Sequence, residues 1–393
     1  KQNPGLKGAF YQWKSSFKKI AQQFSLPDPQ FSYTDYLESV ETRVGPQTSA
    51  FSIKQKFPTF DKLWIRKSKA FKTSEVAYYR FEKRRLDLIL QITNAYYEYV
   101  YLKKAILLTK ENLKLLGNFE SVAQTRYASG LQENQDLLKV QVELGKLEND
   151  LYSLNDLRSA LSARLNALLN LSQENQLPWP NEKLENITLS EKYDDIQKLM
   201  EELKENNPQL RALSQNVEKN KDVLKLSKRE YFPDLTVGFT QVNTGEALIS
   251  SLAGSGKDAQ TVMFSVNVPL WFGRLNAGVQ DAKASLEASQ NLREDKENEL
   301  LSNLSLVHYK LHDAMRQSRL YRDALIPKAQ QTLNATQSGY EAGKVDFLSL
   351  IDSQRILLNF QLAYYRHNAN FNQRYVGIQN LLGKINIQEQ AAY

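Results

Sequence analysis

The chain has 393 residues, of which 41% are hydrophobic and 24% are charged, and it contains no cysteine, which excludes disulfides, zinc–thiolate sites and thiol catalysis. Its 51 Lys and Arg residues are mixed along the chain with 44 Asp and Glu residues. A net charge of +7 would permit contact with nucleic acid. Because basic and acidic residues are mixed, however, most of them are expected on solvated helix faces, and no nucleic-acid partner is expected.

The first part of the chain predicts a short helix followed by a β-hairpin. It opens KQNPGL, without a basic and apolar leader, as expected of a mature exported form or of a trimmed chain. In the hairpin, about residues 30–58, apolar and polar residues alternate: Phe51, Ile53 and Phe57 against Ser52, Lys54 and Lys56. This period of two predicts one apolar and one polar face. The apolar face would look inward in a soluble sandwich and toward lipid in a membrane sheet.

Two long helices follow the hairpin. Residues 62–129 contain one helix-weakening residue, Gly117, and correspond to about 100 Å of helix, far above the globular norm. A turn at Gly130 leads into a helix over 131–170, whose apolar residues recur at steps of three and four. This spacing predicts a coiled coil with the turn at its far end. No run of 18 apolar residues occurs, so no transmembrane helix is expected.

The second half of the chain repeats this order. Residues 171–206 contain Leu177-Pro178-Trp179-Pro180 and a charged helical stretch, which predict a linker with a small helix beside the bundle. The second half then predicts a hairpin at about 234–270, a long helix at 274–338 with a kink at Pro327, a helix at 344–382 and a tail at 384–393.

Matching segments indicate a tandem duplication. Asn3-Pro4-Gly5-Leu6 matches Asn207-Pro208-Gln209-Leu210, and Gly130 matches Gly343. The offset grows between these pairs because the second hairpin has a longer loop with three glycines. We therefore predict a first repeat over 1–170 and a second over 207–383.

The duplicated order resembles that of the TolC-like outer-membrane efflux factors over essentially the whole chain. The motifs that carry the resemblance are NPxL at both openings, LPDP and FPDL before strands, VGP in the first hairpin, FP and VPLW after strands, and YxxG at both turns. Four strands cannot close a barrel, and an open apolar sheet in lipid is forbidden. The resemblance implies a homotrimer, mainly α with membrane β, with a twelve-stranded β-barrel (four strands per protomer) and a long coiled-coil α-helical barrel.

The resemblance also implies a function. It predicts a passive exit duct in the outer membrane of a Gram-negative bacterium, reaching far into the periplasm. Its partners would be outer-membrane lipid, a periplasmic adaptor and an inner-membrane pump of the resistance–nodulation–division class, in the branch that serves metal-cation and drug pumps. A soluble coiled-coil scaffold and a type I protein-secretion duct stay open as alternatives. No nucleophile elbow, P-loop, Rossmann loop or HExxH occurs, so neither an enzyme nor a cofactor is expected.

The resemblance places a gate after the second turn, where the family pattern is roughly G-x5-D-x2-D. In this chain Ser349 replaces the first acid, Asp352 keeps the second position and Asp346 is an extra acid nearer the turn. A ring of three Asp352 carboxylates would attract cations, whereas the simpler alternative is one solvated helix residue. The residues expected to meet the adaptor at the tips are Tyr127, Gly130, Leu131, Glu133, Asp136, Tyr340, Gly343, Lys344 and Val345.

Three further groups have two interpretations each. Lys54 and Lys56 share the polar face of their strand. They would form a basic ring if this face lines a lumen, or they would protect an exposed strand edge. Aromatic residues cluster where strands meet helices: Phe57, Phe60, Trp64, Trp271 and Phe272. They would form an aromatic girdle at a membrane interface, or they would be ordinary core residues. His308 and His312 have the i, i+4 spacing of a metal pair, but His367 is remote in sequence, so a structural role and no metal site are expected.

Overall fold

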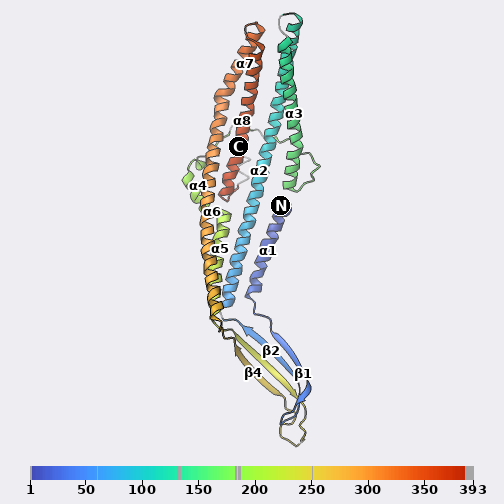
Figure 1. Ribbon diagram of the computed structural model, residues 1–393, viewed down its shortest axis with the longest axis vertical. Coiled ribbons are helices and arrows are strands. Elements are labelled where there is room, and N and C mark those ends of the chain that lie inside the picture. Colours follow the sequence, from blue (N-terminus) through green and yellow to red (C-terminus); the bar gives the residue numbers. More distant parts are fainter. Residues whose placement is uncertain are drawn as a thin grey trace. The chain divides into compact units, whose positions relative to one another are not determined.

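The computed structural model describes residues 2–59, 61–130, 134–181, 184, 187–249 and 251–385, and Phe60, Leu131 and Glu133 lie outside them. The described chain is mostly helical with one small antiparallel sheet (Figure 1), which confirms the predicted mainly α class. The elements are α1 Pro4–Phe24, β1 Gln30–Val40, β2 Gln47–Phe57, α2 Lys62–Ala128, α3 Asn134–Leu169, η1 Glu191–Tyr193, α4 Ile196–Asn206, α5 Pro208–Arg229, β3 Leu235–Thr244, β4 Ala259–Val266, α6 Phe272–Leu320, the π-helical η2 Tyr321–Leu325, α7 Ile326–Glu341 and α8 Phe347–Leu381. None of the described helices is both long and apolar enough to cross a bilayer.

The chain forms two compact units. The tip unit comprises residues 1–8, 81–208 and 296–393, and the sheet unit comprises residues 9–80 and 209–295. Each unit takes segments from both halves of the predicted duplication, so the division into tandem repeats stays a prediction from the sequence.

In the sheet unit, four antiparallel strands lie in the order β1-β2-β3-β4. The register aligns Phe31, Ile53, Phe239 and Val262 in one row across the sheet. The adjacent row contains Ser32, Ser52, Thr240 and Thr261. Since neighbouring residues of a strand point to opposite faces, the sheet has one apolar and one polar face, as the alternation predicts.

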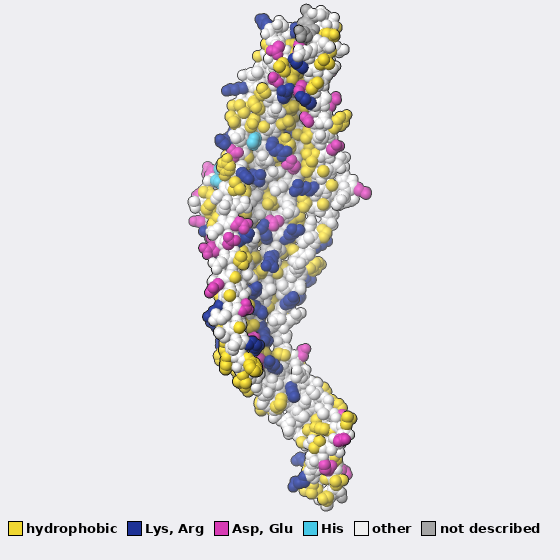
Figure 2. Space-filling view, in the orientation of Figure 1, with side chains coloured by type: hydrophobic (Ala, Val, Ile, Leu, Met, Phe, Trp, Pro, Cys, Tyr) yellow, Lys and Arg dark blue, Asp and Glu magenta, His cyan; other side chains and the backbone are white. Residues whose placement is uncertain are grey.

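In the tip unit, α2 and α3 form one helical hairpin, and α7 and α8 form another (Figure 1). Their residues at steps of three and four share a buried core, as expected for coiled-coil packing. The members are Leu116, Phe119 and Ala123 of α2, Val140 of α3, Ala329, Leu333 and Tyr340 of α7, and Phe347, Leu350, Ile351 and Leu357 of α8. On the face shown in Figure 2, Lys and Arg side chains are interspersed with Asp and Glu side chains over the helices.

The expected disturbance at Pro327 takes the form of a π-helical turn. Proline lacks an N–H and its ring crowds the carbonyl of the residue four positions earlier. The π-helical turn η2 ends at Leu325, two residues before Pro327, and Pro327 is the second residue of α7. A π-turn inserts an extra residue and so relieves the crowding without ending the helix.

The segment after α3 is held against α2 and α3 by polar and aromatic contacts. The Tyr99 hydroxyl donates to the Leu177 carbonyl oxygen at 2.7 Å, and its ring stacks on Trp179 with centroids 4.8 Å apart. The Arg158 guanidinium lies over the Trp179 ring, 4.1 Å from its centroid. The Leu-Pro-Trp-Pro motif is thus a packed element of the tip unit.

Candidate functional site

Both helical hairpins turn on a glycine, and the two turns lie at the same end of the tip unit (Figure 1). The Gly130 N–H donates to the Tyr127 carbonyl and the Gly343 N–H donates to the Tyr340 carbonyl, each at 3.0 Å. Their φ angles are 68° and 73°, in the left-handed region that glycine enters without a Cβ penalty. This local geometry is the physical reason for the repeated glycine, three residues after each tyrosine.

The two tyrosines of this motif have different environments. Tyr340 is 3% exposed and packs on Phe347 with ring centroids 5.2 Å apart, whereas Tyr127 is 46% exposed. The expectation that Tyr340 belongs to an adaptor-docking surface is therefore wrong for this structure, because its side chain is part of the helical core. Tyr127 and Lys344 are exposed, while Val345 and Asp136 are half-buried.

Arg126, near the end of α2, links the first hairpin to the second. Its Nη1 donates to the Tyr340 carbonyl oxygen at 2.7 Å and its Nη2 to the Glu341 carbonyl oxygen at 3.0 Å. The guanidinium also lies 4.8 Å from the Tyr340 ring centroid. These carbonyls belong to the last turn of α7, where cations are favoured by the helix dipole. Arg126 thus clamps the tips of the two hairpins together.

Asp346 and Ser349 form the N-terminal cap of α8. The Asp346 Oδ1 accepts from the Ser349 N–H at 2.8 Å, and Oδ2 accepts from the Ser349 hydroxyl at 2.9 Å. The backbone hydrogen bond from Ser349, followed by the hydroxyl bond, lowers the pKa of Asp346. The structure brings these two predicted gate residues together in a capping arrangement.

Asp352 has a different partner. It pairs with Arg355 at 2.9 Å and is about half exposed. Arg355 also reaches Glu143 of α3 at 2.9 Å and so joins α8 to α3. Burial alone would raise the pKa of Glu143, but the hydrogen bond from Lys146 and the charge of Arg355 outweigh it and lower the pKa.

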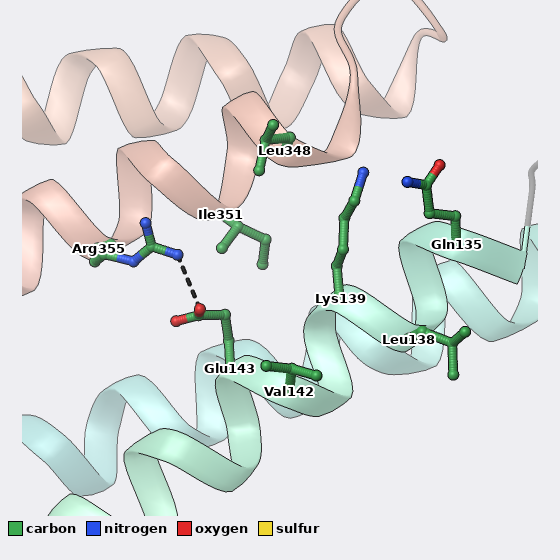
Figure 3. Close-up of a pocket in the computed structure, with 8 residues that line it drawn as sticks. All are labelled: Gln135, Leu138, Lys139, Val142, Glu143, Leu348, Ile351 and Arg355. Carbon is green, nitrogen blue, oxygen red and sulfur yellow. Dashed lines mark ion pairs between the residues drawn. The ribbon is translucent and has the colours of Figure 1, made fainter.

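The same contact closes one side of a groove of about 280 Å³ between α3 and α8 (Figure 3). The groove has apolar and charged lining residues: Gln135, Leu138, Lys139, Val142, Glu143, Leu348, Ile351 and Arg355. Sequence reasoning missed it. The available signal was Leu138 and Val142, which are apolar, four residues apart and outside the buried heptad positions.

The polar face of the sheet carries Lys54 and Lys56, since the register pairs Lys54 with Gly238 and Lys56 with Thr236. Lys56 is not a solitary basic group, because its Nζ lies 3.1 Å from a carboxylate oxygen of Asp234. This ion pair therefore lowers the net positive charge of the predicted basic ring.

Asp234 is the centre of a polar junction where β2, β3 and α2 meet. Its carboxylate accepts from Lys62 Nζ at 2.7 Å and from the Thr59 N–H at 3.1 Å, in addition to the Lys56 pair. The side chains of Lys62 and Asp234 are only 7% and 10% exposed. Burial alone would raise the pKa of Asp234, but hydrogen bonds from Lys62, Lys56 and the Thr59 N–H lower it to about 2.

The described aromatic residues at this junction are exposed: Phe57, Trp64, Trp271 and Phe272. Trp64 packs on Phe24 of α1 with ring centroids 4.8 Å apart. All four side chains are exposed in the single chain, so none of them is a core residue there.

His308 and His312 lie together on α6, with their ring centroids 4.4 Å apart. His367 lies on α8, where its ring stacks on Tyr321. Within the described ranges, no three His, Asp or Glu side chains cluster closely enough to hold a metal ion.

Three comparisons with known proteins fit this architecture. The model of the outer membrane efflux protein family matches residues 199–384, a little under half of the chain. The cobalt-zinc-cadmium resistance protein CzcC of Cupriavidus metallidurans is 22% identical over 386 residues, which cover 97% of this chain and 87% of the relative.

Solved outer-membrane proteins share the fold. The outer-membrane channel OprN superposes with a TM-score of 0.81 at 16% identity, over 98% of this chain and 87% of the other. The outer membrane protein VceC of Vibrio cholerae superposes with a TM-score of 0.75 at 18% identity, over 98% and 93% of the two chains. Residues 199–384 thus match the outer membrane efflux protein family, and the chain shares the fold of solved outer-membrane channels over nearly its whole length.

Proposed function

We propose that the chain is the outer-membrane exit duct of a tripartite efflux pump. In this proposal three copies form the duct, substrates pass through it without energy input from this chain, and the helix tips open and close its periplasmic mouth. A periplasmic adaptor and an inner-membrane pump of the resistance–nodulation–division class supply the substrate. Members of the family are channels and not enzymes, so the chain acts by conducting and gating.

One observation carries the membrane assignment: the apolar face of the sheet is uncovered. In its central row Phe31, Ile53, Phe239 and Val262 are 71%, 47%, 41% and 63% exposed. Large contiguous apolar patches are rare on soluble monomers. Contact with lipid on this side and water on the polar side accounts for both faces of the sheet.

The strand order supports the trimeric part of the proposal. β1 and β4 are the outer strands of the described sheet, and unpaired backbone groups at such edges are costly in lipid. Pairing β1 of one protomer with β4 of the next satisfies these groups. Three copies would then close a twelve-stranded barrel, in agreement with the resemblance.

The groove between α3 and α8 supports adaptor docking in the tip unit. Its apolar residues Leu138, Val142 and Leu348 are exposed, and charged residues border them. This combination suits the apolar stripe of a partner helix. The name of the relative CzcC refers to resistance to cobalt, zinc and cadmium, and we propose the same metal-cation branch for this chain.

Membrane fractionation with detergent extraction tests the proposal against its alternatives. An exit duct is expected to remain in the outer-membrane fraction after washing with salt and to need detergent for a monodisperse state. A monodisperse monomer without detergent would establish the soluble scaffold instead. A type I secretion duct would behave like the efflux duct in this assay, and co-purification with the pump then distinguishes the two.

The gate part of the proposal predicts an effect of Asp352→Ala on divalent-cation block. Three exposed carboxylates near a narrow mouth would attract divalent cations. Their removal should therefore raise the cation concentration that blocks the single-channel current by about tenfold or more. The control is Asp313→Ala, which removes a carboxylate of α6 that pairs with Arg316. An unchanged block in Asp352→Ala would remove this residue from the gate.

The clamp by Arg126 predicts easier opening in Arg126→Ala. Charge-assisted hydrogen bonds contribute about 1.5 kcal/mol or more, so the ratio of open to closed channels should rise about tenfold. Arg126→Lys keeps the charge but cannot reproduce the forked contact with two carbonyls, and an intermediate ratio is expected. If single-channel recordings give the same ratio for all three proteins, the clamp does not hold the mouth closed.

A further inference from the structure

The imidazoles of His308 and His312 converge on one backbone carbonyl. Their Nε2 atoms are 3.1 Å apart, and the Tyr193 carbonyl oxygen lies 2.9 Å from His308 Nε2 and 3.4 Å from His312 Nε2. All these groups belong to the tip unit. Three potential donor atoms therefore form a compact triangle on one side of α6.

The dimensions of this triangle fit the coordination shell of a small divalent cation. Metal–nitrogen and metal–oxygen bonds of about 2.0–2.1 Å place neighbouring ligand atoms about 2.8–3.4 Å apart, from right-angled to tetrahedral geometry. All three separations in the triangle lie in this range. The Asp194 carboxylate is 3.9 Å from His312 Nε2 and adds a negative charge beside it.

The carbonyl is held in place by the surroundings of Tyr193. The Tyr193 side chain is buried, its ring lies 4.9 Å from the Tyr375 ring, and its hydroxyl accepts from Gln379 Nε2 at 3.4 Å. The neighbouring Lys192 pairs with Glu202 at 3.6 Å, so a competing ammonium is directed to another partner. Such supporting contacts orient ligands before a metal arrives.

The hydrogen-bonding capacity of the imidazoles also suits a metal. A neutral imidazole has one nitrogen with a free lone pair. Hydrogen bonding alone can satisfy the cluster only if one Nε2–H serves both the carbonyl and the other ring.

We infer that His308, His312 and the Tyr193 carbonyl oxygen form a binding site for a divalent transition-metal ion of the Zn²⁺ kind, with Asp194 as a neighbouring carboxylate. Imidazole ligands favour such ions over Mg²⁺ and Ca²⁺. The site differs from a cluster of three acidic or histidine side chains because its third donor is a backbone oxygen. Binding fastens η1, in the segment between α3 and α4, onto α6.

Zinc titration of the whole purified protein tests this inference. The protein is produced without a polyhistidine tag and is first treated with a chelator. Isothermal calorimetry should find one saturable Zn²⁺ per protomer, and His308→Gln or His312→Gln should each weaken binding about tenfold or more. His367→Gln is the matched control, because it removes the third histidine of the chain, and its affinity should equal that of the wild type. Zn²⁺ should also raise the unfolding midpoint of wild type and His367→Gln.

Three results would overturn the inference, provided that circular dichroism shows each variant to be folded. They are absence of a saturable site with one equivalent of Zn²⁺, unchanged affinity in the His308→Gln/His312→Gln double variant, and equal loss in His367→Gln. In each case the cluster is a hydrogen-bonded contact between α6 and η1.

Discussion

Asp234→Asn is expected to lower the stability of the protein by about 3 kcal/mol, because it leaves the buried Lys62 ammonium without its counter-charge. The remaining hydrogen bond from Lys62 to the Phe232 carbonyl at 2.9 Å keeps the loss at the lower end of the range for broken buried pairs. Thermal unfolding in detergent should show a midpoint lower by roughly 4 °C. The control Asp323→Asn removes an exposed partner of Arg322 and should cost less than about 1 kcal/mol.

The pKa of Asp234 gives this prediction a pH dependence. The pKa is about 2 in the folded protein and 3.8 for an unperturbed aspartate. A lowered pKa means that the ionised carboxylate stabilises the fold fully above the unfolded value, and that this contribution is lost as the pH falls through about 4 toward 2. The difference between wild type and Asp234→Asn should therefore shrink over this interval. A difference independent of pH would show that the carboxylate charge does not stabilise the junction.

Val262→Arg should impair membrane insertion, whereas Thr261→Arg should not. Val262 lies on the apolar face opposite Phe239, and Thr261 lies on the polar face opposite Thr240. An arginine facing lipid near the centre of a bilayer costs about 2–4 kcal/mol, while lumen positions tolerate it. The measurement is the fraction of unfolded protein that becomes protease-resistant on addition of lipid vesicles.

The two variants control for each other because they place the same side chain at adjacent positions of one strand. If both insert as well as the wild type, the apolar face does not meet lipid. If Thr261→Arg fails and Val262→Arg inserts, the faces are assigned the wrong way round.

Periodicity in the sequence predicts the mainly helical class and the two faces of the sheet. The alternation around Ile53 depends only on the geometry of a strand, and the turns at Gly130 and Gly343 depend only on local backbone conformation. Such features are encoded within a few residues, and for this reason they can be read without a structure.

Long-range contacts of the candidate site could not be predicted in this way. Lys62 and Asp234 are 172 residues apart in sequence, and Arg126 contacts carbonyls of α7 that no residue type marks. The repeated Tyr-x-x-Gly suggests equal roles for both tyrosines, but only Tyr340 meets a facing core that buries it. The carbonyl of Tyr193 beside His308 has no sequence signal, because every residue carries a carbonyl.

Single-channel recording in planar lipid bilayers tests the exit-duct proposal most directly. The purified protein, shown by protease protection to be inserted, should produce discrete conductance steps. Arg126→Ala should raise the open fraction, and divalent cations should block the current less in Asp352→Ala. Inserted wild-type and Arg126→Ala protein that both leave the bilayer non-conducting would contradict the proposed channel.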